Sequence, residues 1–243
     1  MTDNLLDNEP IARKNLVLFY LIDTSGSMEG TKIGTVNTVM EETIPEVRGV
    51  GGSDADVKVA VMTFDDDVKW IYDHPISVEE FTWKRLDAGG WTCMGDAFDE
   101  LNEKLSRTEY LQSPSLSFAP VIFLLSDGYP NPGYEKPLEK LKRNRWFKYS
   151  LKIAFAVGQD ADKDVLSDFT GNPESVVTVN NGKALARLIK KLTVKSSQIG
   201  SKSYVGGDEP LTDDQADQMK QNELLKEIKN SVEPGDLEFD DGW

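Results

Sequence analysis

The sequence has few of the residues on which disulfide-stabilised proteins, zinc proteins and many hydrolases depend. Its 243 residues include one cysteine, Cys93, and one histidine, His74. A single cysteine excludes an intramolecular disulfide framework. A single histidine removes most routes to a zinc site and to histidine-assisted nucleophilic catalysis. Any chemistry is therefore expected to use carboxylates, hydroxyls and a hard metal ion such as Mg²⁺.

Basic residues are also scarce, since 27 lysines and arginines face 42 aspartates and glutamates and give a net charge of −15. This balance argues against a general nucleic-acid partner and against binding to an anionic membrane. No apolar run approaches the ~20 residues that span a bilayer. Residues 1–10 contain no basic residue and no apolar centre of a secretory signal. We therefore expect a cytoplasmic protein.

Four short apolar runs have the length of buried strands, and each is followed by Asp, Ser or Gly. They are Leu16–Ile22, Val57–Phe64, Val121–Leu125 and Leu151–Val157. Two weaker strands are expected at Val68–Tyr72 and Val176–Val179. Only three residues connect the run Val57–Phe64 to the strand that begins at Val68. Because a parallel crossover needs a longer connection, that strand must run antiparallel to its predecessor.

Helical patterns separate the strands, and they cover Ile33–Val47, Cys93–Ser106, Glu135–Arg145, Lys163–Phe169 and Gly182–Lys195. Alternating strands and helices are typical of a parallel sheet with helices on both faces. The sequence thus predicts an α/β protein with a doubly wound, mostly parallel six-stranded sheet and one antiparallel edge strand.

The composition changes near residue 200. Residues 200–243 hold 12 acidic residues and four lysines, a net charge of −8. We predict an N-terminal segment at 1–11, a main domain at 12–199, and an acidic linker and tail at 200–243 with a helix at 212–232. The tail is interpreted either as solubilising charge or as a docking peptide that folds on a partner.

The segment Asp23-Thr24-Ser25-Gly26-Ser27 follows the first buried strand directly. Ligands of open α/β sheets bind beyond the carboxyl ends of the strands, so this position favours a site. Asp127 follows the third long apolar run, and the glycine-rich loop 89–95 delivers Thr92 just before a helix. These elements offer three hydroxyls and two carboxylates, which are oxygen ligands suited to Mg²⁺.

The three separated elements resemble the von Willebrand factor A (VWA) domain with its metal-ion-dependent adhesion site (MIDAS), over about residues 12–199. The resemblance implies a Rossmann-like fold and a metal site formed by Asp23, Ser25, Ser27, Thr92 and Asp127. It implies Mg²⁺ as the cofactor, with Mn²⁺ or Ca²⁺ as alternatives. It also implies that a partner protein supplies an Asp or Glu to complete the metal's ligands.

Within this family the chain is most similar to bacterial tellurium-resistance TerY-type proteins. The similarity rests on the runs LIDTSGSM at 21–28, PVIFLLSDGYP at 120–130 and AVGQDAD at 156–162. It implies a cytosolic adaptor of a stress-response complex, associated with a PP2C-type phosphatase and a protein kinase. Trp91 departs from the small residue that related loops carry beside the threonine.

The residues therefore favour a non-enzymatic, Mg²⁺-dependent interaction adaptor with no catalytic residues. The alternative is a metal-dependent phosphoester hydrolase, which would use the same carboxylates around a divalent ion. Against it, the sequence contains no P-loop. A secreted adhesion domain is disfavoured by the absent signal and disulfides. Asp65–Asp67 is interpreted as a solvated hairpin tip, and Cys93 as a small buried residue.

Overall fold

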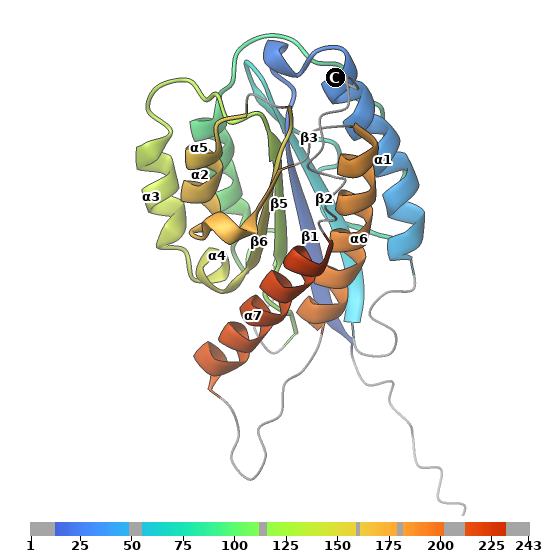
Figure 1. The fold of residues 1–243 in the computed structure, drawn as a ribbon. Coiled ribbons are helices and arrows are strands. Elements are labelled where there is room, and N and C mark those ends of the chain that lie inside the picture. The colour runs from blue at the N-terminus through green and yellow to red at the C-terminus, as the bar shows by residue number, and fades with distance from the viewer. Residues whose placement is uncertain are drawn as a thin grey trace, which may run out of the picture.

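A seven-stranded sheet lies at the centre of the computed structural model, which describes residues 13–48, 55–111, 116–158, 161–178, 182–201 and 212–231. Six strands follow one another in the order β3-β2-β1-β5-β6-β7, and β4 also pairs with β2. Figure 1 shows the twisted sheet between two layers of helices. The bounds are β1 Lys14–Asp23, β2 Ala55–Phe64, β3 Val68–Trp70, β4 Ile76–Ser77, β5 Val121–Ser126, β6 Leu151–Ala156 and β7 Val176–Thr178.

The predicted fold class is confirmed: β1, β2, β5, β6 and β7 pair in parallel, and the edge beside β2 is antiparallel. That edge contains one strand more than expected. β3 pairs with residues 62–64 of β2, and β4 pairs with residues 58–59. A two-residue strand such as β4 has no periodicity that a sequence pattern could reveal.

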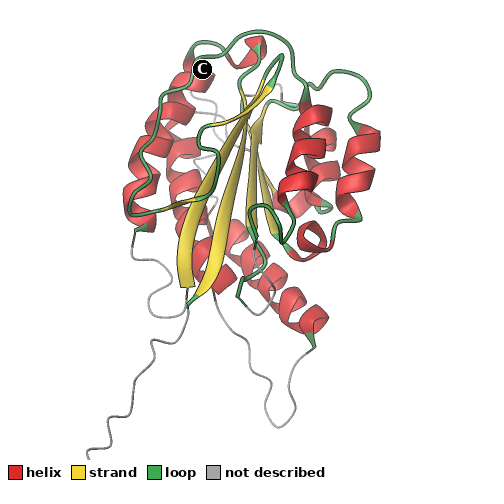
Figure 2. Ribbon diagram, turned by 180° about the vertical axis from the view of Figure 1, so that it is seen from behind, coloured by secondary structure: helices red, strands yellow, loops and turns green. Residues whose placement is uncertain are grey.

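Helices cover both faces of the sheet, as Figures 1 and 2 show. Their bounds are α1 Thr31–Val47, α2 Met94–Lys104, α3 Glu135–Lys142, α4 Arg145–Tyr149, α5 Lys163–Thr170, α6 Gly182–Ser201 and α7 Asp213–Ser231, with the short 3₁₀ turns η1 Gly26–Met28 and η2 Pro173–Ser175. The helix expected at 135–145 ends earlier, at Lys142, and a second short helix, α4, begins at Arg145. The division occurs because Asn144 adopts an extended backbone and its side chain accepts hydrogen bonds from the amides of Trp146 and Phe147, which starts a new helix.

The central strand β1 is buried on both faces. Leu16, Leu18, Tyr20 and Ile22 contribute to the core beneath α1 and α6. Val17, Phe19 and Leu21 contribute to the core beneath α2, α3 and α5. This burial explains why β1 is a continuous apolar run, with no alternation of polar residues.

Tyr20 carries a polar group within the apolar run Leu16–Ile22 of β1. Its hydroxyl donates a hydrogen bond of 3.0 Å to Oγ1 of Thr193 on α6. Burial raises the pKa of Tyr20 above its usual value, so the phenol stays protonated and keeps this bond.

Helix α7 packs on the same core as the rest of the domain. Its Leu224 and Ile228 are buried with residues of α1 and α6, and its Lys220 donates a 2.8 Å bond to the carbonyl of Gly200. The expected domain limits of 12–199 and 200–243 stay a prediction, and α6 runs past the boundary to Ser201. Residues 1–11, Phe239 and Trp243 lie outside the described residues.

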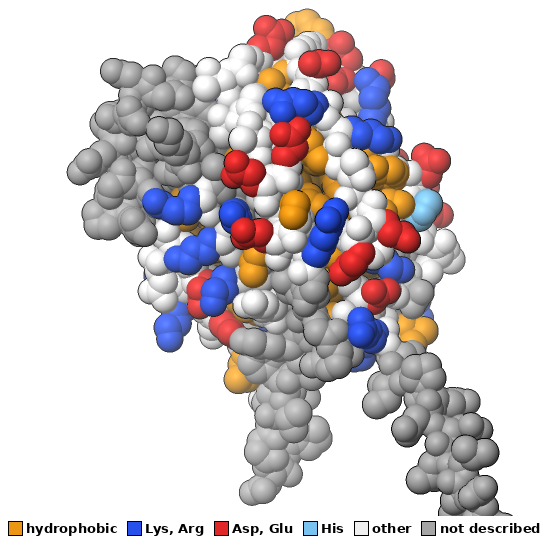
Figure 3. Space-filling model, turned by 90° about the vertical axis from the view of Figure 1, so that its right-hand side faces the viewer, with side chains coloured by type: hydrophobic (Ala, Val, Ile, Leu, Met, Phe, Trp, Pro, Cys, Tyr) orange, Lys and Arg blue, Asp and Glu red, His pale blue; other side chains and the backbone are white. Residues whose placement is uncertain are grey.

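The side of the molecule in Figure 3 carries acidic and basic side chains close together. Two glutamates of α1 form ion pairs with basic residues from other segments. Arg85 Nη1 lies 3.0 Å from Glu41, and Lys190 Nζ lies 2.7 Å from Glu46. The exposed surface is therefore mixed in charge here. Among the described residues, the helices are all too short or too polar to cross a membrane.

Candidate metal site at the carboxyl edge of the sheet

The register of the sheet brings two of the predicted site segments together. Ile22 on β1 pairs with Leu125 on β5, so Asp23 lies beside Ser126 at the carboxyl edge of both strands. This edge contains the strand-order reversal, because β1 is followed on one side by β2 and on the other by β5. Open α/β sheets bind ligands at this kind of position.

Asp23 is fully buried and held from both sides. Its Oδ1 accepts a 2.9 Å hydrogen bond from the amide of Ser25, and its Oδ2 accepts a 2.6 Å bond from the hydroxyl of Ser126. Desolvation raises the pKa of Asp23 to about 6, against the lowering effect of these hydrogen bonds. The carboxylate is thus fixed in place, and keeping it charged costs free energy that a nearby cation would offset.

The two serines of the segment lie next to each other. Ser25 Oγ and Ser27 Oγ are 3.1 Å apart; Ser25 is buried and Ser27 is exposed. Gly26, between them, does not adopt a positive φ. Its amide instead donates a 3.0 Å bond to the carbonyl of Gly90, and a Cβ at Gly26 would lie 3.3 Å from that oxygen. The glycine therefore allows close packing against the next loop.

The loop that carries Thr92 is attached to the site by its backbone. Gly89 donates a 2.8 Å bond to the carbonyl of Thr24, and Asn131 donates a 3.0 Å bond to the carbonyl of Thr92. The loop thus joins the segment after β1 to the segment after β5. Thr92 is 7% exposed, whereas its neighbour Trp91 is 72% exposed. The threonine faces inward and the tryptophan lies on the surface.

Asp127 is the second buried carboxylate. Its Oδ2 lies 3.2 Å from Nζ of Lys32 on α1, and its Oδ1 has no hydrogen-bond partner among the described residues. An unpaired buried carboxylate oxygen is unfavourable unless a further ligand compensates it. This oxygen is therefore an observation in favour of a bound cation at the site.

Gly128 fixes the backbone after Asp127. It has a φ of 79°, and a Cβ there would clash with the carbonyl of Asp162. Its amide donates a 2.9 Å bond to Ser126 Oγ, while the Asp127 carbonyl accepts a 2.8 Å bond from the amide of Asp162. Only glycine combines this conformation with so close an approach.

Sequence reasoning missed two contributors, Ser126 and Lys32. Ser126 directly precedes Asp127. Its hydroxyl accepts a hydrogen bond from the amide of Gly128 and donates one to the carboxylate of Asp23. Lys32 was identifiable in principle, since a lysine in the first turn of a helix is unfavourably placed relative to the helix dipole.

The acidic turn between β2 and β3 does more than the expected solvated tip. Asp65 Oδ2 accepts a 3.1 Å bond from the hydroxyl of Thr24, and its carbonyl accepts a 3.0 Å bond from the amide of Cys93. Asp66 Oδ1 accepts a 2.8 Å bond from the amide of Trp91. The turn therefore supports the loop that carries Thr92.

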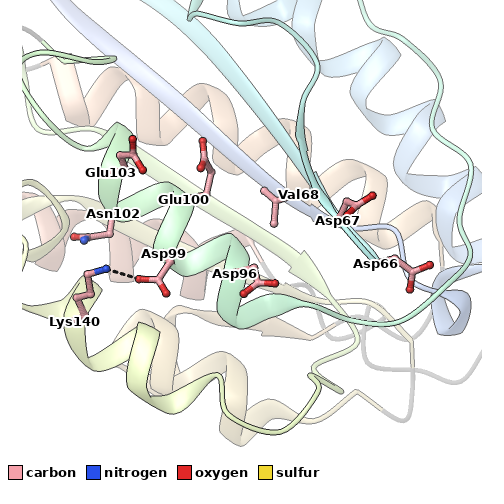
Figure 4. Close-up of a pocket in the computed structure, with 9 residues that line it drawn as sticks. All are labelled: Asp66, Asp67, Val68, Asp96, Asp99, Glu100, Asn102, Glu103 and Lys140. Carbon is pink, nitrogen blue, oxygen red and sulfur yellow. Dashed lines mark hydrogen bonds and ion pairs between the residues drawn. The ribbon is translucent and has the colours of Figure 1, made fainter.

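A hollow of about 540 Å³ lies beside this loop, on the α2 side (Figure 4). Its lining is acidic except for Val68, Asn102 and Lys140, which pairs with Asp99 at 2.6 Å. The acids are Asp66, Asp67, Asp96, Asp99, Glu100 and Glu103. Among the described residues, no three Asp, Glu, His or Cys side chains converge on a metal position. A cation is therefore better accommodated at the edge with Ser25 and Ser27, where hydroxyls supplement two carboxylates.

The donor set at the sheet edge fits a hard divalent cation. It combines neutral hydroxyls with the buried carboxylates of Asp23 and Asp127. Within the part of the chain that the structure describes, one of these carboxylate oxygens has no hydrogen-bond partner. Mg²⁺ prefers such oxygen ligands.

Comparison with known proteins identifies the family of this fold. The model of the von Willebrand factor type A domain matches residues 18–191, which include all five predicted site residues. The chain belongs to the von Willebrand factor A family. Members of this family are typically metal-dependent protein-interaction modules, and their MIDAS motifs bind divalent metals.

Solved structures with the VWA fold are similar to this chain over about three quarters of its length. Proximal thread matrix protein 1 from the mussel byssus, with a zinc-occupied MIDAS motif, has 20% identity and a TM-score of 0.56, and the match covers 75% of this chain and 48% of that one. The ArnB paralog VWA2 from Sulfolobus acidocaldarius has 17% identity and a TM-score of 0.54, with 74% and 46% covered. The pilus adhesin SpaC from Lactobacillus rhamnosus GG, in its open conformation, has 12% identity and a TM-score of 0.60, with 76% and 30% covered.

The chain thus spans about half or less of the length of these proteins. At this level of identity the likeness shows the shared fold. No curated protein matches the chain in sequence.

Proposed function

We propose that this VWA domain is a non-enzymatic, Mg²⁺-dependent protein-interaction module. Asp23, Ser25, Ser27, Thr92 and Asp127 would hold the ion, with Mn²⁺ or Ca²⁺ as alternatives. The observation that carries the proposal is the Oδ1 of the buried Asp127, which has no hydrogen-bond partner in the described ranges of the chain, beside a second buried carboxylate. A bound Mg²⁺ supplies a positive centre that an external anion can approach.

The partner is proposed to be a protein that presents an Asp or Glu to the ion. Ser27 is exposed, so the site opens to solvent on this side. Trp91 and Tyr129 flank it on two different loops and are 72% and 48% exposed. Exposed tryptophans and tyrosines beside a charged centre are typical of binding hot spots. We infer that they contact the partner residues around the acid.

The phosphoester hydrolase receives less support from the geometry. Asp23 is held by Ser25 and Ser126, and Asp127 is paired with Lys32, so both carboxylates are engaged in positioning. The only histidine of the sequence, His74, lies exposed between β3 and β4, whose pairing with β2 moves away from the carboxyl edge. A general base must lie within hydrogen-bond reach of the proton that it removes.

The cellular role that we propose is an adaptor in a bacterial cytosolic stress-response complex of the tellurium-resistance TerY type, with a PP2C-type phosphatase and a protein kinase as partners. It rests on the sequence runs around Asp23, Asp127 and residues 156–162. It does not extend to nucleic acids or membranes.

The metal site is tested by thermal unfolding of the full chain in EDTA and in millimolar Mg²⁺ or Mn²⁺. A cation that binds the folded state raises the melting temperature of the wild type. Asp23→Ala is expected to lose this rise. Asp56→Ala, which removes an exposed carboxylate at the opposite end of β2, is the matched control and is expected to keep it. A wild-type melting temperature that neither cation changes would contradict the proposal.

The interaction is tested by affinity capture from a lysate of the source organism, with wild type and the Asp23→Ala/Ser25→Ala variant as baits. Partners of the site should be captured with Mg²⁺ and released by EDTA, and the variant should not capture them. Mass spectrometry would then show whether a phosphatase and a kinase are among them. Partners that remain in EDTA and with the variant would place the binding surface elsewhere.

A further inference from the structure

Lys32 is the cationic side chain that the structure places against the candidate metal site. It lies at the second residue of α1, and its Nζ is 3.2 Å from Asp127 Oδ2. The side chains of the two residues are 17% and 1% exposed, so the pair is largely removed from water. Ion pairs in such surroundings are screened much less than pairs on the surface.

Helix stability does not account for a lysine at this position. The first turn of α1 contains no acidic residue, and its cap, Gly30, provides no side-chain hydrogen bond. A positive charge there opposes the helix dipole, which favours anions at the N-terminus. The contact with Asp127 is a favourable interaction that Lys32 gains from its position.

The contact between Lys32 and Asp127 changes the net charge that a metal ion would meet. Asp23 and Asp127 carry two negative charges and Lys32 one positive charge, so the metal-free site has a net charge of about −1. Asp65, the next carboxylate, is engaged outside this set by Thr24 and by Lys69 at 3.7 Å. A divalent cation changes the net charge of the three buried groups to about +1, whereas without Lys32 it would bring them to neutrality.

We propose that Lys32 is a built-in competitor of the metal ion. In the metal-free protein it neutralises Asp127, and a divalent cation binds only by displacing or approaching this ammonium group. The loaded site then keeps one positive charge, which an external carboxylate neutralises, so the free protein binds metal weakly and a carboxylate partner strengthens it. This inference rests on the proposed metal site and adds the residue that sets its affinity.

The expected size of the effect follows from the contact that the cation must replace. A hydrogen bond to a charged group contributes roughly 1.5–3 kcal/mol, which corresponds to a ten- to hundredfold change in an equilibrium constant. Lys32→Met, which keeps the length and the helix propensity of the side chain, is therefore expected to bind Mn²⁺ about ten- to a hundredfold more tightly than the wild type.

Mn²⁺ affinity of the full chain is measured by calorimetry or by electron paramagnetic resonance of free Mn²⁺. The variants are Lys32→Met, Lys32→Gln and Lys32→Arg, and the last keeps the charge and is expected to stay within about threefold of the wild type. Lys190→Met is the matched control, because it removes a lysine that pairs with Glu46 near the other end of α1. Lys32→Gln retains a polar group and serves if Lys32→Met does not fold.

Unfolding in EDTA provides an independent reading. Lys32→Met leaves Asp127 buried without its counter-ion, so this variant should melt below the wild type in EDTA and show a larger rise with Mn²⁺. A lysine with a merely structural role would lower the melting temperature in both conditions and leave the Mn²⁺ affinity unchanged.

The outcomes separate this inference from the proposed function. Tighter Mn²⁺ binding by Lys32→Met or Lys32→Gln, with Lys32→Arg and Lys190→Met near the wild type, supports the inference. Equal or weaker binding by the uncharged variants, while the wild type binds Mn²⁺, overturns the inference and leaves the metal site intact. Absence of Mn²⁺ binding by the wild type and by every variant refutes the proposed metal site and this inference together.

Discussion

Removal of one buried hydroxyl, that of Ser126, is expected to destabilise the protein more than its size suggests. Ser126 Oγ donates a 2.6 Å hydrogen bond to the carboxylate of Asp23 and accepts a 2.9 Å bond from the amide of Gly128. All three residues lie at the end of β5 or directly beside it. Ser126→Ala deletes both bonds, so the Asp23 carboxylate and the Gly128 amide each lose this partner.

The magnitude can be worked from these two contacts. A hydrogen bond to a charged group contributes roughly 1.5–3 kcal/mol, and a buried donor left unsatisfied costs about 1–3 kcal/mol. The two effects overlap in one small region, so we expect a loss of about 3 kcal/mol in the free energy of unfolding. For a chain of this size, that loss lowers the melting temperature by roughly 6–12 °C.

The matched control is Ser196→Ala on α6. Ser196 is also fully buried, but its hydroxyl has no hydrogen-bond partner among the described residues. Its removal is expected to change the free energy of unfolding by about 0 to +1 kcal/mol, since no bond is lost.

Equilibrium unfolding in urea, with EDTA present, measures both variants under the same conditions. The expected result is a clearly lower midpoint for Ser126→Ala at an unchanged slope, and a midpoint near the wild type for Ser196→Ala. Equal losses for the two variants would refute the reasoning, because they would show that the hydroxyl contacts of Ser126 carry no special weight.

Three further predictions follow. Lys152 is half-buried and Lys220 is buried, and desolvation lowers the pKa of each to about 8, below the usual 10.5. The folded state therefore binds these protons less tightly than the unfolded chain, and the free energy of unfolding should rise between pH 8 and 10, with a weaker rise for Lys220→Met in urea titrations. Trp91→Ala should change the free energy of unfolding by less than about 0.5 kcal/mol, because Trp91 is mostly exposed. The same substitution should weaken the binding of a Mg²⁺-dependent partner at least tenfold in surface plasmon resonance, and an unchanged affinity would exclude Trp91 from the interface. Leu224→Ala should cost about 2–4 kcal/mol in chemical unfolding because Leu224 is fully buried on α7, and a loss under 1 kcal/mol would show that α7 adds little to the fold.

The layered α/β architecture was predictable because strands buried on both faces are continuous apolar runs. The runs at β1, β2, β5 and β6 appear at nearly their observed bounds, and the antiparallel edge followed from a connection of three residues. Strand β4 was not predictable, since two residues carry no periodicity. The break between α3 and α4 depends on the side chain of Asn144 accepting from two amides, a local choice that competes with a continuous helical pattern.

In the candidate site, too, some residues could be predicted from the sequence and others could not. Asp23, Ser25, Ser27, Thr92 and Asp127 could be named from their positions at the ends of apolar runs and before a helix, because parallel strands end at one edge of a sheet. Ser126 and the acidic turn at 65–66 could not be assigned to the site. Their contribution consists of hydrogen bonds to Asp23, to Thr24 and to the amide of Trp91, which join segments up to 103 residues apart.

The sequence by itself determined the fold class and predicted the edge for a ligand and the oxygen chemistry of the candidate site, because these depend on hydrophobic patterns and residue types along the chain. Only the tertiary structure decided that Asp127 has one oxygen paired with Lys32 and one without a partner among the residues that the structure describes, and that Trp91 lies on the surface while Thr92 faces inward. The physical reason is that burial and pairing of a charge depend on which distant segments surround it, and those surroundings set both the energy of the charge and its availability to a cation.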